Sequence, residues 1–141
     1  MTSSDANEPG DAVEQAVEAA LSRVLGALHP PFEIDGLTAR AMYEPEPEHR
    51  GNPGWLHGGN AATLLDHICA RAAANALGTR VVTGTLDLRY RQPVPLAGGP
   101  YVLEATAEPS RRRTVRVAGA LRRSDGTPLV EAKALFVTLP D

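Results

Sequence analysis

The sequence contains a single cysteine, no excess of positive charge and no long apolar run, and each absence excludes a class of protein. Cys69 alone cannot form an intrachain disulfide, and such cysteine usage is typical of a reducing compartment. The net charge of −3 gives no reason to expect nucleic acid or an anionic membrane as a partner. No stretch approaches the length of a membrane span, and residues 1–5 lack the basic and apolar regions of a signal peptide. We therefore expect a cytoplasmic protein.

Metal-binding patterns are lacking as well. Neither Cys-x-x-Cys nor His-Glu-x-x-His occurs in the sequence. The acidic loop at residues 44–54 contains His49, but its prolines disfavour a regular arrangement of ligands. We expect neither a metal ion nor a bound cofactor.

The 141 residues are enough for one domain with a single core. Residues 1–10 are polar and are predicted to be disordered, which leaves one domain over residues 11–141. Helical spacing of apolar residues predicts an N-terminal helix from Asp11 to the residue before Pro30-Pro31, and a long central helix over residues 58–77 that ends at Gly78. Alternating residues predict strands at 37–43, 82–91, 101–108, 114–122 and 129–139. This order favours an α+β fold in which an antiparallel sheet wraps around the central helix.

The start of the central helix is the most informative stretch of the chain. Gly58 and Gly59 follow His57 there, and glycine leaves the first backbone N–H groups without a shielding Cβ. Such amides have no acceptor within the helix and lie at the positive end of its dipole, so they can receive a polarised oxygen. The alternative is that the two glycines only permit close packing of the helix.

Asp66 follows Gly58 by about two helical turns. At about 100° per residue, four polar residues of this helix form one stripe, namely Asn60, Thr63, His67 and Arg71. Asp66 falls outside that stripe, and its neighbours at helical spacing are Ala62, Cys69, Ala70 and Ala73. A carboxylate in such surroundings indicates a cleft or a surface that another subunit covers. An ordinary solvated helix aspartate is the alternative.

The stretch from His57 to Asp66, with its His-Gly-Gly and its acid nine positions after the histidine, resembles the signature of hotdog-fold acyl-CoA thioesterases. The resemblance is to the phenylacetate-pathway branch, which also contains mammalian mitochondrial members, and it continues through residues 83–94. It implies the hotdog fold, hydrolysis of acyl-CoA thioesters, and self-association as a homodimer or a dimer of dimers.

The resemblance also implies roles for individual residues. The Gly58 amide would polarise the thioester carbonyl, and Asp66 of the opposite subunit would act as general base or nucleophile. His57 would orient the loop and contact the thioester, unless it is only a structural histidine. Thr83 takes the place of the Ser or Thr that steadies the acid, although alternation along 82–91 puts it on the polar face as a plain β-forming residue. Asn52 precedes the histidine by five residues rather than the usual six, so it is either the water-positioning asparagine of a shorter loop or a turn residue.

Arg111, Arg112 and Arg113 lie between two predicted strands. Because guanidinium groups bind phosphate bidentately, these arginines are candidates for holding the nucleotide end of coenzyme A. They can equally form a solvated charged turn.

Two other functions of the same fold stay open. A non-catalytic acyl-CoA-binding or regulatory module would keep Gly58 and lack turnover. Hydratases of this fold carry an Asp-x-x-x-x-His pair, and the residue five positions after Asp66 is Arg71, which disfavours that reading. The acyl group, and the choice between coenzyme A and a carrier protein, stay open too.

Overall fold

The structure is a computed structural model that describes residues 26–140 together with Ala12 and Ala16. In chain order its elements are η2 (Gly26–Leu28), β1 (Phe32–Asp35), β2 (Thr38–Tyr43), η3 (Pro47–His49), α2 (Gly58–Leu77), β3 (Val81–Tyr90), η4 (Leu96–Gly98), β4 (Tyr101–Ala107), β5 (Thr114–Arg122) and β6 (Pro128–Thr138). The predicted disorder of residues 1–10 lies outside the described residues. So does the predicted N-terminal helix, apart from Ala12, Ala16 and the 3-10 turn η2 at its end.

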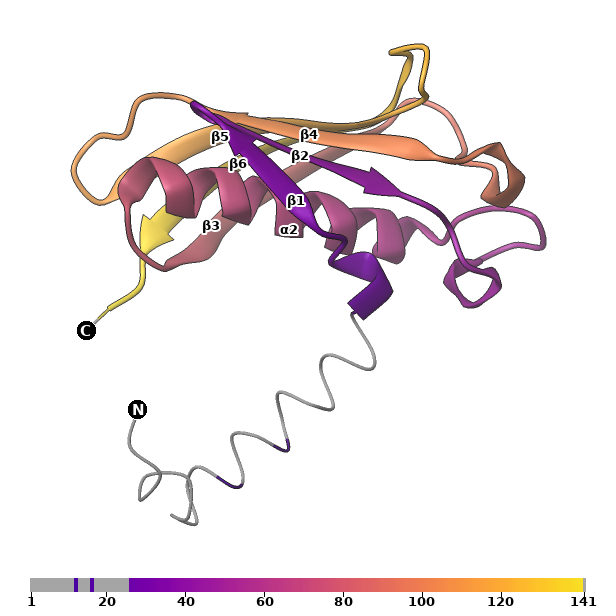
Figure 1. Cartoon of the computed structure of the whole chain (residues 1–141), viewed down its shortest axis with the longest axis horizontal. Helices are drawn as coiled ribbons and strands as arrows, with labels where there is room; N and C mark the ends of the chain where they lie inside the picture. The colour runs from indigo at the N-terminus through magenta and orange to yellow at the C-terminus, as the bar shows by residue number, and fades with distance from the viewer. Residues whose placement is uncertain (1–11, 13–15, 17–25, 141) are drawn as a thin grey trace.

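One antiparallel sheet carries α2 on one of its faces. The strands lie in the order β1-β2-β4-β5-β6-β3, and each neighbouring pair is antiparallel. The sheet curls so that β2, β4 and β5 pass on one side of α2 while β3 passes on the other (Figure 1). The predicted α+β hotdog arrangement, a sheet wrapped around a long central helix, is confirmed.

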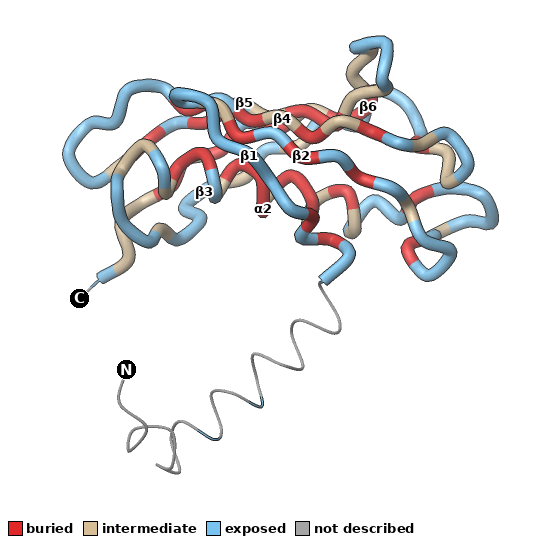
Figure 2. The backbone as a smooth tube through the Cα atoms, in the orientation of Figure 1, coloured by how far each residue is buried: buried red, intermediate tan, exposed pale blue. Residues whose placement is uncertain are grey.

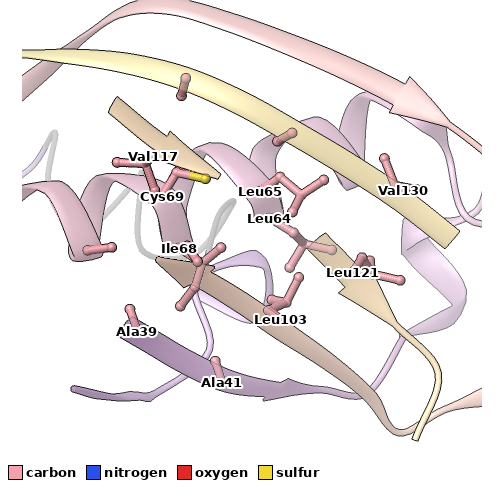
Figure 3. Packing of buried hydrophobic residues seen from close by; sticks show 14 of the residues in the cluster. Ala39, Ala41, Leu64, Leu65, Ile68, Cys69, Leu103, Val117, Leu121 and Val130 are labelled. Atoms are coloured by element: carbon pink, nitrogen blue, oxygen red, sulfur yellow. The ribbon is translucent and has the colours of Figure 1, made fainter. Parts of the chain in front are cut away.

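The core lies between α2 and the sheet, and the strands contribute alternate residues to it (Figure 2). In β4 the buried residues are Tyr101, Leu103, Ala105 and Ala107. From α2, Leu64, Leu65, Ile68 and Cys69 point into the same core (Figure 3). Gly119 on β5 lets the helix approach closely, because a Cβ at that position would lie 2.7 Å from the Sγ of Cys69.

The strand β1 was not predicted, so the prediction of a single strand before the central helix was wrong. All four residues of β1 are exposed, and the strand is held by its pairing with β2, in which Phe32 lies opposite Ala41. The four residues, Phe-Glu-Ile-Asp, do alternate between apolar and polar, but the pattern is at the shortest length that indicates a strand and follows directly on Pro30-Pro31, and it was missed.

The alternation predicted for β3 was also wrong at its start. The register shifts between Thr83 and Thr85, so that a β-bulge forms at Gly84. A Cβ on Gly84 would lie 3.2 Å from the carbonyl oxygen of Leu135, which explains the glycine. Thr83 lies opposite the buried Phe136, and cross-strand partners share a face. The bulge therefore places Thr83 on the face toward α2, where simple alternation would have put it on the outer face.

Candidate active site

His57 caps the N-terminus of α2 and leaves one amide open. Its Nδ1 accepts a hydrogen bond from the Gly59 N–H at 2.9 Å, and its carbonyl oxygen accepts from Asn60 and Ala61 at 3.0 and 3.1 Å. The Gly58 N–H has no acceptor among the described residues. Of the amides at the helix mouth, that of Gly58 is thus the one available to a ligand oxygen.

The two glycines of the mouth differ in the room that the fold leaves for a side chain. A Cβ on Gly59 would lie 3.0 Å from the His57 Nδ1, so the imidazole cap needs glycine there. A Cβ on Gly58 would meet the Tyr90 ring at 3.7 Å, an ordinary contact. Packing therefore leaves room for a Cβ at Gly58 and does not by itself explain the glycine there.

The loop that precedes the mouth is anchored by His49, which is buried. The carbonyl oxygen of His49 accepts from the His57 N–H and from the Asn60 Nδ2, both at 2.9 Å. The Tyr43 hydroxyl donates to His49 Nδ1 at 2.7 Å, and burial raises the pKa of Tyr43. From the sequence, His49 was considered only as a possible metal ligand. In the structure it anchors the loop to the start of α2, and this role could not be predicted because it depends on contacts with residues of other elements.

A hollow of about 710 Å³ opens beside the helix mouth. It is lined by Arg50, Gly51, Asn52, Trp55, Leu56, His57, Gly58 and Pro93. Asn52, His57 and Gly58, three of the predicted site residues, are thus brought together on one surface. The Asn52 carbonyl also closes a turn by accepting from the Trp55 N–H at 3.0 Å.

Asp66 is half-buried on α2 and is held by Thr83 from β3. The Thr83 Oγ1 donates to Asp66 Oδ1 at 2.8 Å, a contact that depends on the bulge at Gly84. The neighbouring Cys69 thiol has its pKa raised to about 12, first by burial and then by the charge of Asp66. The Cys69 thiol is therefore neutral near pH 7.

His67, which the polar stripe of α2 was predicted to include, is buried. Its ring stacks on that of His29 with centroids 4.0 Å apart, and Phe32 packs edge-on against it. Burial, followed by the charges of His29 and Arg71, lowers the pKa of His67 to about 4. The imidazole is therefore neutral near pH 7, and the stripe is interrupted at this point.

Gly58 and Asp66 of one chain are too far apart to act on one carbonyl. Eight residues separate them on one helix, which corresponds to about 12 Å along its axis. Arg111, Arg112 and Arg113 lie in the turn between β4 and β5, at the end of the molecule opposite the start of α2 (Figure 1). A single chain thus brings together Asn52, His57 and Gly58, and separately Asp66 with Thr83.

Comparison with known protein families identifies the chain's relatives. The profile of the family described as thioesterase superfamily matches residues 53–130, more than half of the chain. The chain belongs to the thioesterase superfamily. The region that this superfamily profile matches includes the helix mouth, Asp66 and Thr83.

Individual relatives of this thioesterase superfamily chain agree with that assignment. It is 33% identical over 99 residues to the acyl-coenzyme A thioesterase THEM4 of Xenopus laevis. This match covers 70% of this chain and 44% of that protein. The chain thus spans less than half the length of that relative. A thioesterase superfamily protein from Shewanella loihica PV-4 has a solved structure with a TM-score of 0.63 and 28% identity, covering 79% of this chain and 91% of that one. The structure of S. sahachiroi AziG gives a TM-score of 0.75 at 18% identity, covering 84% and 97%, and supports the fold alone.

No helix among the described residues is both long and apolar enough to cross a membrane.

Proposed function

We propose that the chain hydrolyses acyl-CoA thioesters at composite sites, each formed by Gly58 of one subunit and Asp66 of another. The observation that carries this proposal is that β3 contacts both groups, at opposite ends. Near its start Thr83 donates to Asp66, and at its last residue the Tyr90 hydroxyl donates to the Gly58 carbonyl oxygen at 2.7 Å. Along the strand, Thr83 and Tyr90 themselves are about 20 Å apart.

Pairing of two β3 strands about a twofold axis would bring these ends together. β3 stands at one end of the strand order, so one edge of its ten residues is unpaired within the described part of the chain. With the twofold axis between Leu86 and Asp87, Thr83 of one subunit would lie opposite Tyr90 of the other, and Asp66 would then approach the partner's Gly58. Val82 and Tyr90 on this strand are 41% and 53% exposed, which supports its use as an interface.

In such a site each group has a distinct task. The Gly58 N–H donates to the thioester carbonyl oxygen, which gains negative charge as the carbon is attacked. Asp66 either takes a proton from the attacking water or attacks the carbonyl itself. In the first route the tetrahedral intermediate collapses to the carboxylic acid, and the thiolate leaves and receives the proton. In the second route an anhydride forms on Asp66 with loss of the thiolate, and water then hydrolyses it.

Coenzyme A is proposed as the leaving group because the relative from Xenopus laevis bears acyl-coenzyme A thioesterase in its name. The turn that carries Arg111, Arg112 and Arg113 is tied to the start of β3, since Arg113 Nε donates to Thr138 Oγ1 at 3.0 Å and Thr138 lies opposite Val81. Antiparallel pairing of β3 would move this turn toward the helix mouth of the partner subunit. There the arginines would be placed to bind the phosphates of coenzyme A.

The test is an Asp66→Asn variant, assayed by thiol release from a panel of acyl-CoAs. Removal of a general base is expected to lower kcat by about 10²–10⁴-fold, because the amide keeps the size of the side chain but cannot accept the proton. Asp125→Asn, in the turn between β5 and β6, makes the same change of charge away from β3 and can keep the bond to the Thr127 N–H, so it is the control. Wild-type turnover in folded Asp66→Asn would refute the role of Asp66. Wild-type protein that binds acyl-CoA without releasing thiol would instead support the non-catalytic binding module.

A further inference from the structure

We propose that Tyr90 is a positioning residue for the oxyanion-binding amide of Gly58, so that the strand proposed to join the subunits also orients the reaction centre. This inference rests on the function proposed above and adds a residue that neither the motif at the helix mouth nor the acid on α2 includes.

The peptide between Gly58 and Gly59 is held at both ends. Its carbonyl oxygen accepts from the Tyr90 hydroxyl at 2.7 Å, and its N–H donates to His57 Nδ1 at 2.9 Å. Because the peptide unit is planar, two hydrogen bonds at opposite ends fix its orientation. The residues on both sides are glycines, whose backbone is the least restricted, so these two bonds add to the constraint that the first turn of α2 places on the plane.

The neighbouring peptide carries the Gly58 N–H. Its carbonyl, that of His57, accepts from Asn60 and Ala61 and so belongs to the hydrogen bonding of α2. The two planes are joined only by the backbone rotations of Gly58. Holding the second plane therefore limits the directions in which the Gly58 N–H can point, and an oxyanion donor is effective when its direction is fixed before the reaction.

Packing does not explain Tyr90. Its side chain is 53% exposed, and the ring would meet a Cβ on Gly58 only at 3.7 Å. Phenylalanine would keep the same ring contact and lose the bond to the carbonyl. Partial burial raises the pKa of the Tyr90 hydroxyl, so it stays protonated and remains a donor in the neutral range.

The variant Tyr90→Phe isolates the hydroxyl. We expect kcat for acyl-CoA hydrolysis to fall about 5–30-fold, the effect of one hydrogen bond, with KM and the oligomeric state unchanged. The control is Tyr101→Phe, which removes another tyrosine hydroxyl bond to a backbone carbonyl, that of Pro95, outside the Gly58 peptide. Steady-state kinetics, size-exclusion chromatography and thermal melting of both variants give the comparison.

A double-mutant cycle separates positioning from a general loss of structure. Gly58→Pro removes the N–H that Tyr90 is proposed to orient, so Tyr90→Phe should have no further effect on kcat in that background. A fall in kcat that persists there would overturn the inference, as would a Tyr90→Phe enzyme with wild-type kcat or one that fails to form dimers. If the wild-type protein releases no thiol, the proposed function itself is refuted. If the wild type and Tyr90→Phe are equally active, only the inference about Tyr90 is refuted.

Discussion

Replacing Gly58 by proline would remove one N–H and change little else. Gly58 is the first residue of α2, where proline is tolerated because the N–H has no acceptor within the helix. His57 has φ −65° and ψ 134°, the extended conformation that a residue before proline adopts. The added ring carbons enter a space in which a Cβ would lie 3.7 Å from Tyr90. The helix is therefore expected to form normally in the variant.

The expected effect follows from the role assigned to this amide. Loss of one oxyanion donor typically raises the barrier by about 3–4 kcal/mol, so kcat should fall by about 10²–10³-fold in Gly58→Pro. Gly58→Ala is the matched control, since it adds a Cβ at the same place and keeps the N–H. Thiol release at saturating acyl-CoA, with circular dichroism to verify folding, gives the comparison. Equal activity of folded proline and alanine variants would refute the assignment of the oxyanion donor.

Two further predictions concern Thr83 and His67. Thr83→Val removes the donor to Asp66 and should lower kcat by about 10-fold. The control is Thr85→Val, which lies beyond the bulge and on the outer face of the sheet. Equal kcat in the two variants would contradict a role for the Thr83–Asp66 contact. The folded-state pKa of His67, about 4, lies below its ordinary value of 6.5, so the unfolded chain binds a proton that the folded chain does not. The contribution of neutral His67 to the free energy of unfolding should be fully present above pH 6.5 and be lost as the pH decreases toward 4. Allowing for solvent screening, the free energy of unfolding should fall by about 1–2 kcal/mol. Urea unfolding at pH 7 and pH 4.5 should show this loss in the wild type and a smaller one in His67→Gln, and identical losses would contradict the assignment.

The elements set by local signals could be predicted closely. The helix over residues 58–77 matches α2, and Gly78, with φ 70°, ends it as a left-handed cap. The strands after the helix differ from their predicted ranges by at most one residue at either end. β1 was missed although Phe32–Asp35 alternates between apolar and polar residues, because the run is only four residues long and the strand is stabilised by pairing with β2 and not by a buried face of its own.

The candidate site was only partly predictable for the same reason. Gly58 and Asp66 stand in one contiguous stretch, so their spacing can be read directly. Thr83 follows from the family resemblance, whereas its contact with Asp66 depends on a bulge set by the distant Leu135 carbonyl. Tyr90 carries no local signal, because its bond to Gly58 joins residues 32 positions apart.

The central claim is that each reaction centre draws its amide and its acid from different subunits, and co-expression of two inactive variants tests it most directly. A mixed dimer of Asp66→Asn and Gly58→Pro chains would hold one site with both groups intact and one with neither. With random pairing, the account predicts that thiol release recovers to about a quarter of the wild-type rate per chain. Activity that stays at the sum of the two separate variants would contradict the account, because every site would then have drawn both groups from a single chain.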